Sequence, residues 1–222
     1  MVNAAVRQRP AAVETREWKR VLEWEGEPVL SLCLQYPSVP GDAPGLRRVD
    51  RYYQRLAQHW RARWEGPLYL QARACAQALR ERSRPFQPWE ARLTYCVTCQ
   101  TETMLSLYAD AYEYAGGAHG LTTRRGDAWD LPAGLPRTLA SFFPPRCPWR
   151  KLVLEQVERD IRRRLDTGES WFEPDWQRLA VREFDPERFY CTPEGPQVFY
   201  PLYSIAPYAE GIPVFPIAPP AL

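Results

Sequence analysis

The chain has 222 residues, of which 45% are hydrophobic and 25% charged, so it is an ordinary globular sequence with one large domain or two small ones. Its 29 basic and 27 acidic side chains nearly balance, and the longest basic run is Arg162-Arg163-Arg164, which argues against nucleic-acid binding. No stretch is long and apolar enough for a membrane span, and the N-terminus lacks a secretory signal. As written, the sequence predicts a cytoplasmic protein.

The N-terminal part is expected to contain one strand and then a long helix. Residues 1–25 are polar and rich in Arg, which predicts a loose segment. The apolar run at residues 29–36 predicts a strand that Pro37 closes. A helix kinked at Gly66-Pro67 is predicted over residues 46–82. Apolar side chains recur there at spacings of three and four: Leu46, Val49, Tyr53, Leu56 and Trp60, then Leu68, Ala72, Cys75 and Leu79.

The middle of the chain is rich in Thr, Tyr, Val and Leu, which predicts three antiparallel strands. Their expected limits are residues 89–100, 102–114 and 118–130. Gly116 and Gly117 supply the turn between the second and third strands, because glycine tolerates positive φ.

The C-terminal part is expected to return to helix and then to strand. A Pro-punctuated loop at residues 131–148 precedes a helix at 149–166, with Gly168 as its C-cap. Further expected elements are a short helix within 172–183, a hairpin over 188–203 and a last strand at 212–217. Because strands and helices come in blocks, the fold class predicted is α+β: an antiparallel sheet with helices packed on it, in a single domain.

Cys96 and Cys99 form a Cys-x-x-Cys pair inside a predicted strand, where residues three apart point to opposite faces. Zinc usually needs a second pair or two added His, and a redox dithiol normally opens a helix. We therefore expect structural thiols, with no metal and no cofactor. A cytoplasmic thiol protein stays open as a third functional hypothesis.

His119 follows the double glycine and is the candidate acid or base. A general base needs an orienting carboxylate or a nucleophile nearby. Four carboxylates are candidate partners, but the sequence alone does not place any of them near His119: Asp110, Glu113, Asp127 and Glu210. We therefore favour a turn histidine and predict no catalytic residue.

Several segments in the second half of the chain resemble a known family. They are the segment from Tyr112 to Gly120 with its Gly-Gly-Ala-His-Gly motif, the strand reaching Trp129, residues 139–143, and the Ile-Ala-Pro-Tyr-Ala-Glu-Gly run ending at Gly211. Their order is similar to that of a domain of unknown function in the extracytoplasmic part of RsiV-type anti-sigma factors. The same domain accompanies the catalytic domain of PdaC-type peptidoglycan deacetylases. The resemblance covers residues 90–222 well.

The resemblance implies a domain over residues 26–222, divided into a strand and helical portion at 26–88 and a motif-bearing portion at 89–222. In that family the domain binds and senses, is usually extracytoplasmic, and in RsiV-type proteins binds lysozyme. It implies a non-catalytic binding module whose partner is an unknown protein or a cell-wall glycan. A glycan-acting enzyme using His119 is the alternative. The expected binding residues are Tyr112, Tyr114, His119, Trp129, Tyr203 and Tyr208, and the expected turn residues are Gly116, Gly117, Gly120 and Gly211.

Overall fold

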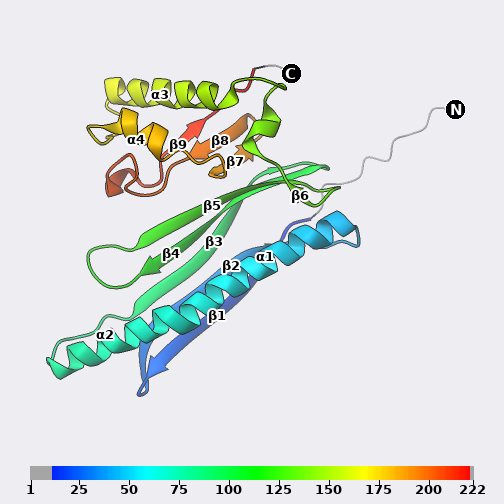
Figure 1. Cartoon of the computed structure of the whole chain (residues 1–222). Helices are drawn as coiled ribbons and strands as arrows, with labels where there is room; N and C mark the ends of the chain where they lie inside the picture. Colours follow the sequence, from blue (N-terminus) through cyan, green and yellow to red (C-terminus); the bar gives the residue numbers. More distant parts are fainter. Residues whose placement is uncertain (1–11, 221–222) are drawn as a thin grey trace.

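The computed structural model describes residues 12–220, which form a six-stranded sheet with further layers on both faces (Figure 1). The α+β class and the single domain predicted from the sequence are confirmed. The strands of this sheet, in spatial order, are β1 (Glu14–Trp24), β2 (Glu27–Ser38), β3 (Trp89–Gln100), β4 (Met104–Tyr114), β5 (Leu121–Asp130) and β6 (Leu135–Pro136).

β1 is a regular edge strand, although the sequence predicted a loose segment over residues 1–25. It pairs antiparallel with β2 from Glu14 to Trp24. Trp18, Leu22 and Trp24 lie on one face and pack against the apolar core, while most other side chains of the strand are exposed. The many charged residues between them concealed this alternation of a half-buried strand. Residues 1–11 of the predicted loose segment lie outside the described residues.

β2 and β3 pair in parallel, which is the one departure from the predicted antiparallel sheet within residues 12–220. The chain between them forms a long helical connection. Parallel neighbours need such a crossover, whereas a short turn can only reverse the chain. The remaining neighbours are antiparallel, so the sheet is mixed.

The predicted kinked helix is present as three consecutive segments: α1 (Pro44–Arg63), a π-helical turn (Trp64–Leu68) and α2 (Tyr69–Glu81). Pro67 lies inside the π-helical turn. Proline cannot donate the regular intrahelical hydrogen bond, so the distortion is expected at this position. Val49, Tyr53 and Ala57 form the buried stripe of α1, and the fully buried Trp64 continues it into the turn.

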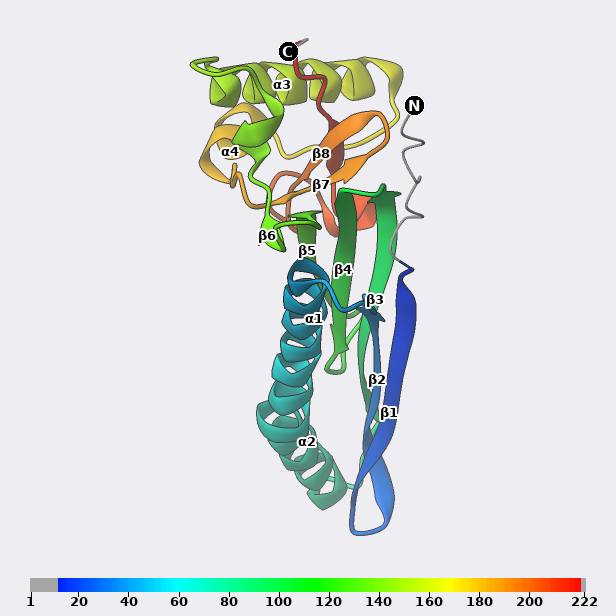
Figure 2. The same ribbon diagram turned by 90° about the vertical axis from the view of Figure 1, so that its right-hand side faces the viewer.

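The two faces of the six-stranded sheet carry different layers (Figure 2). Leu105 and Leu107 of β4 pack in one core cluster with Val49 and Tyr53 of α1. Ser106, which points to the opposite face, accepts a 2.7 Å hydrogen bond from the backbone N–H of Cys191 in the C-terminal layer. The period-two alternation of β4 therefore places α1 and the C-terminal layer on opposite sides of the sheet.

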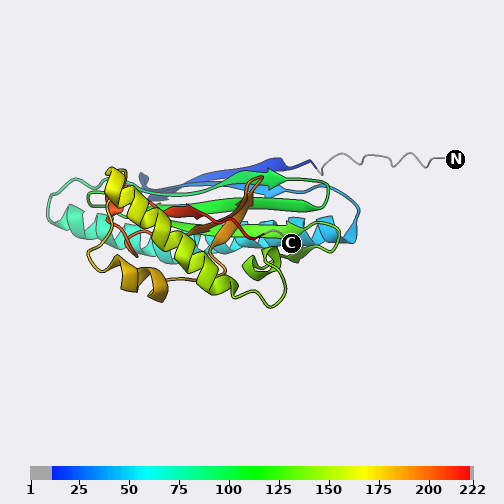
Figure 3. The same cartoon turned by 90° about the horizontal axis from the view of Figure 1, so that it is seen from above.

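The C-terminal layer consists of a small antiparallel sheet covered by helices. Seen from above, α3 runs obliquely across the strands (Figure 3). Val153, Val157 and Ile161 of α3 are fully buried against it, and Gly168 ends α3 with φ of 68°. None of the helices between residues 12 and 220 has the length and apolar composition that a bilayer crossing requires. The elements of this layer are a 3-10 turn (Leu139–Phe142), α3 (Trp149–Thr167), α4 (Trp176–Arg182), β7 (Phe189–Thr192), β8 (Gly195–Phe199), a second 3-10 turn (Tyr208–Glu210) and β9 (Val214–Pro216).

Candidate binding site

An aromatic cluster joins the β4–β5 turn to the segment that precedes β9. The His119 ring stacks on the Tyr208 ring with centroids 3.8 Å apart and an interplanar angle of 16°. The Tyr203 hydroxyl lies 3.1 Å from His119 Nε2, and the rings of Tyr203 and Tyr208 are 5.5 Å apart. Tyr203 is half exposed, so the cluster presents aromatic surface to solvent.

Glycines and hydrogen bonds hold this cluster in place. Gly116 and Gly117 have φ of 83° and 93°, which lets the chain reverse between β4 and β5. The Tyr208 hydroxyl donates to the Gly120 carbonyl at 3.0 Å. A side chain on Gly120 would collide with the Tyr112 ring 2.5 Å away. Gly211, with φ of 68°, follows the 3-10 turn that carries Tyr208.

Of the other predicted binding residues, Tyr112 borders the cluster through its ring beside Gly120. The Tyr112 ring contacts the Arg92 guanidinium at 4.8 Å, and the Tyr114 hydroxyl is 3.1 Å from the Gly117 carbonyl. Trp129 is only 6% exposed and donates its indole N–H to the Tyr53 hydroxyl at 2.8 Å. Its ring packs against Tyr52 and Tyr53 of α1, apart from the aromatic cluster and beside a cleft along β5.

No carboxylate pairs with His119 within residues 12–220, because its hydrogen-bond partner is Tyr203. Asp110 holds Arg124 through two hydrogen bonds of 2.8 and 2.7 Å. Glu113 accepts from Arg63 and from the Trp64 indole, both at 2.7 Å. These carboxylates support the fold, and the described residues contain no cluster of His, Cys, Asp and Glu suited to a metal ion.

Cys96 is exposed and Cys99 is buried. The prediction that they point to opposite faces is wrong, because a register shift between Val97 and Cys99 leaves Cys96 near Tyr190 and Cys99 near Cys191, both on the side of the C-terminal layer. Burial raises the pKa of the Cys99 thiol, and it raises the pKa of the neighbouring Cys191 to about 12. A raised pKa disfavours the reactive thiolate. Cys99 and Cys191 lie in one core cluster and act there as small apolar side chains.

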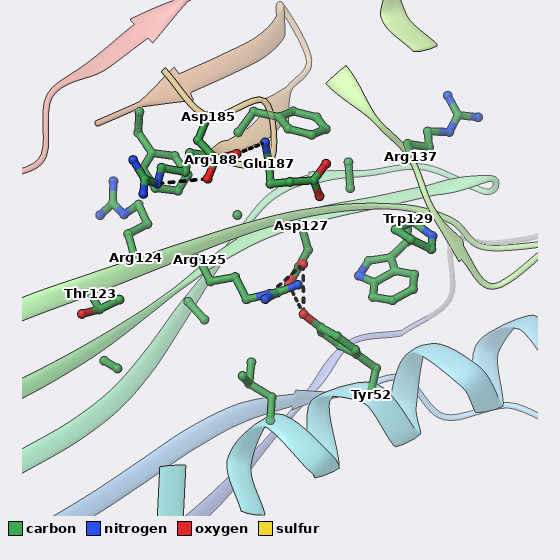
Figure 4. A pocket seen from close by; sticks show the side chains of 18 of the residues that line it. Tyr52, Thr123, Arg124, Arg125, Asp127, Trp129, Arg137, Asp185, Glu187 and Arg188 are labelled. Carbon is green, nitrogen blue, oxygen red and sulfur yellow. Dashed lines mark hydrogen bonds and ion pairs between the residues drawn. The ribbon is translucent and has the colours of Figure 1, made fainter. Parts of the chain in front are cut away.

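A cleft of about 510 Å³ lies beside β5 and opens between the two layers of the protein (Figure 4). Tyr52, Leu56 and Trp60 of α1 form one wall. The chain from Asp185 to Phe189, which leads into β7, forms the other wall. This size falls within the range of protein ligand sites.

β5 forms the floor of the cleft with seven consecutive residues, from Thr123 to Trp129. Side chains alternate between the two faces of a strand, so an uninterrupted run of lining residues means that the cleft follows the backbone edge. Gly126 lies in the middle of this run. A Cβ at this position would lie 2.0 Å from the Phe189 carbonyl oxygen, so only glycine lets β7 approach so closely.

A buried carboxylate of β5 lies on the α1 side of the cleft. Asp127 is 8% exposed, and its Oδ1 accepts hydrogen bonds of 3.2 Å from both the Tyr52 hydroxyl and Arg125 Nε (Figure 4). The Tyr53 hydroxyl lies 3.4 Å from its other oxygen. Burial raises the pKa of Asp127, and the Arg125 charge and the tyrosine hydroxyls oppose that rise.

The opposite wall combines a paired and an unpaired carboxylate. Asp185 lies 3.5 Å from Arg188 and also accepts the Glu187 backbone N–H at 3.0 Å (Figure 4). The Glu187 side chain is exposed and makes no ion pair or hydrogen bond within residues 12–220. The α1 side of the cleft therefore combines aromatic side chains with the Arg125–Asp127 ion pair, and the opposite side carries charged side chains beside Phe189.

Sequence reasoning did not identify the cleft. Its walls come from residues near 55 and near 187, and the floor lies between them in sequence. The one sequence signal was Gly126 inside a predicted strand, since glycine in a strand interior often marks a close approach of backbone or ligand.

Two family models match the sequence on either side of the cleft floor. Residues 25–122 match the family described as "Deacetylase PdaC", and residues 140–218 match the "Protein of unknown function (DUF3298)" family. The predicted resemblance to a domain of unknown function associated with PdaC is confirmed. The α1 wall belongs to the first match and the 185–189 wall to the second, so the cleft lies where the two parts meet.

Solved structures share the fold over nearly the whole chain. A DUF3298 family protein from Pseudomonas aeruginosa PAO1 has a TM-score of 0.63 and 18% identity, covering 94% of this chain and 90% of that one. A DUF3298 family member from Bacteroides fragilis NCTC 9343 has a TM-score of 0.67 and 16% identity, covering 95% and 91%. Identities this low establish the fold alone. No curated protein matches the chain.

Proposed function

We propose that this chain, which joins a PdaC-type part to a DUF3298 part, is a non-catalytic binding module. Its recognition surface consists of the cleft along β5 and the neighbouring cluster of His119, Tyr203 and Tyr208. The observation that carries the proposal is the cleft itself, a concave site whose floor is a strand edge and whose walls come from both parts of the chain. Such seams between structural units are common places for ligand sites.

The chemistry of the surface favours binding over turnover. A catalytic His needs an orienting partner, and His119 is hydrogen-bonded to Tyr203 and stacked on Tyr208 instead. In the cleft, Arg125 is paired with Asp127 and Arg188 with Asp185. Exposed Tyr, His and Arg side chains are typical of recognition surfaces.

The proposed partner is a protein or a cell-wall glycan. This choice rests on the resemblance to the extracytoplasmic domain of RsiV-type proteins, and it carries with it a proposed location outside the cytoplasm.

Binding and turnover should be measured on the same samples. The full chain, immobilised, is screened against a panel of lysozymes and soluble cell-wall fragments, and each bound candidate is then checked for chemical conversion. We expect binding of at least one candidate with no conversion, and weaker binding after Tyr203→Ala.

The matched control is Trp171→Ala. It removes another exposed aromatic side chain, 75% exposed and outside both the cluster and the cleft, and should leave binding unchanged. Conversion of a panel member that is lost in His119→Ala would establish the enzymatic alternative. No binding to any panel member would count against the proposed function.

A further inference from the structure

The outer edge of β5 is open over most of its length. β6 covers only its end, pairing with Trp129 and Asp130. After Pro136 the Arg137 N–H donates a backbone hydrogen bond to the Ala128 carbonyl at 2.7 Å, and the chain then leaves the sheet. Residues 122–127 consequently have no neighbouring strand on this side within residues 12–220.

The backbone groups that face this open edge follow from the hydrogen bonds at the end of β5. The N–H of Leu131 donates inward to Thr103, which precedes β4, at 2.9 Å, whereas the carbonyls of Ala128 and Asp130 accept outward bonds of 2.7 Å. The β4–β5 register has no bulge, so even-numbered residues continue to face outward. The outward N–H and C=O groups are therefore those of Thr122, Arg124 and Gly126.

An open edge of this kind is a template for another strand. Natural proteins usually protect such edges, because the unpaired groups recruit any extended chain. Here the edge from Thr123 onward forms the floor of a cleft of about 510 Å³. The outward N–H and C=O groups repeat about every 6.8 Å along a strand. An extended polypeptide repeats its own hydrogen-bonding groups at that spacing, and a chain of sugar rings does not.

From this geometry we infer that the β5 edge binds an extended segment of a partner protein as an added strand, with apolar and basic side chains in alternation. The inference rests on the proposed binding function and names the class of partner. Alternate side chains of the added strand point to opposite faces. One set meets Tyr52, Leu56 and Trp60 on α1, and the other set meets the unpaired Glu187 carboxylate. Main-chain hydrogen bonds supply affinity in this mode, and the two walls supply selectivity.

The test uses the full chain and synthetic peptides of about ten residues, the length that spans a typical strand. The probe alternates Val and Lys. Its matched peptides have Glu in place of Lys, or N-methyl groups on alternate backbone amides. We expect the Val–Lys peptide to bind, and N-methylation in one of the two alternate registers to weaken binding at least about tenfold, because it blocks the hydrogen bonds to β5. The Val–Glu peptide should bind less tightly than the Val–Lys peptide.

The protein variants are Thr122→Pro and Thr122→Val. The proline removes one outward N–H without breaking the β4–β5 ladder, since proline is tolerated at the open side of an edge strand. The valine keeps that N–H. We expect Thr122→Pro to weaken peptide binding at least about tenfold and Thr122→Val to leave it unchanged, with thermal unfolding confirming that both are folded.

Several results would overturn the inference. If the peptides fail while a lysozyme or a cell-wall fragment binds, strand addition is wrong and the proposed binding function stands. If the native chain dimerises and Thr122→Pro abolishes the dimer, the occupant is a second copy and not a partner protein. Equal peptide binding by native protein and Thr122→Pro would also refute the inference. Failure of every probe would contradict the proposed function as well.

Discussion

The two edges of the six-stranded sheet are protected in different ways. β1 lies at one edge, open to solvent, and carries the exposed charges Glu14, Arg16, Glu17 and Lys19 along its length. Charged side chains on an edge oppose pairing with a second chain. The β5 edge is bordered by walls, with α1 on one side and residues 185–189 on the other. The exposed charges on β1 therefore oppose pairing with any strand, whereas the walls beside β5 admit only a strand that fits between them.

The two edges also differ in the burial and the pKa of a carboxylate that each one carries. Glu17 on β1 is exposed, and hydrogen bonds from Gln35 and Lys19 lower its pKa. Asp127 on β5 is buried, and burial raises its pKa. The β1 carboxylate is thus exposed to solvent, whereas the β5 carboxylate is buried beside the cleft. This difference is expected between an edge that is only protected and an edge that binds a ligand.

The largest loss of stability is expected for a substitution that breaks a hydrogen bond between β5 and β4. Thr123→Pro removes an N–H that faces β4 and leaves its acceptor on β4 unpaired, at a cost of up to about 3 kcal/mol in the free energy of unfolding. Thr122→Pro removes an outward N–H and should cost far less. Denaturant unfolding of both variants measures the difference, and equal losses would show that the assignment of inward and outward groups is wrong.

The next effect concerns the close approach of β7 to β5. Gly126→Ala would bring a Cβ to 2.0 Å from the Phe189 carbonyl oxygen, and the backbone shift needed should cost about 1–3 kcal/mol. Gly26→Ala, in the β1–β2 turn, meets no atom within 4 Å but has φ of 83°. Its cost should be about 1 kcal/mol, from backbone strain alone. A smaller loss of unfolding free energy for Gly126→Ala than for Gly26→Ala would contradict the packing of β7 on β5.

At the β1 edge, removal of charge should change association more than stability. Replacing Glu17 and Lys19 together by Val leaves an apolar exposed face beside Val21. Surface changes of this kind usually alter the free energy of unfolding by about 0.5 kcal/mol or less, but the edge loses its protection. We expect concentration-dependent self-association by size-exclusion chromatography with light scattering, and a variant that stays in the native oligomeric state would refute the protective role of these charges.

The smallest expected effect is a pH dependence of opposite sign at the two edges. The raised pKa of Asp127 means that the folded protein disfavours its charged form, so native protein should lose stability relative to Asp127→Asn as pH rises through that pKa. The lowered pKa of Glu17 means that native protein should lose stability relative to Glu17→Gln as pH falls through that pKa. Unfolding temperatures of the three proteins over a pH series measure both slopes, and slopes of the same sign would contradict the contrast.

Much of the fold could be predicted because its signals are local. The three- and four-residue spacing of apolar side chains identified α1 and α2, and Gly66-Pro67 located the break between them. The parallel pairing of β2 with β3 was not predictable in the same way, because it depends on how the chain returns after the helix.

The candidate site shows the same limit. The segments carrying His119 and Tyr208 were both selected from the sequence, and the structure stacks their rings. The cleft required knowledge of three distant segments at once, and neither Tyr52 nor Glu187 differs in sequence from an ordinary helix or loop residue. Trp129 was also selected as a binding residue, and the structure places it largely buried, among the residues that line the cleft. Residue type alone does not distinguish an exposed aromatic from a buried one.

The most direct test of the account is residue-resolved amide hydrogen exchange along β5, measured by NMR with and without the Val–Lys peptide. In the free protein, the outward amides of Thr122, Arg124 and Gly126 should exchange faster than the inward amides of Thr123, Arg125 and Asp127, which are bonded to β4. Bound peptide should slow the outward amides selectively. Peptide binding that leaves the exchange of those three amides unchanged would contradict strand addition at this edge.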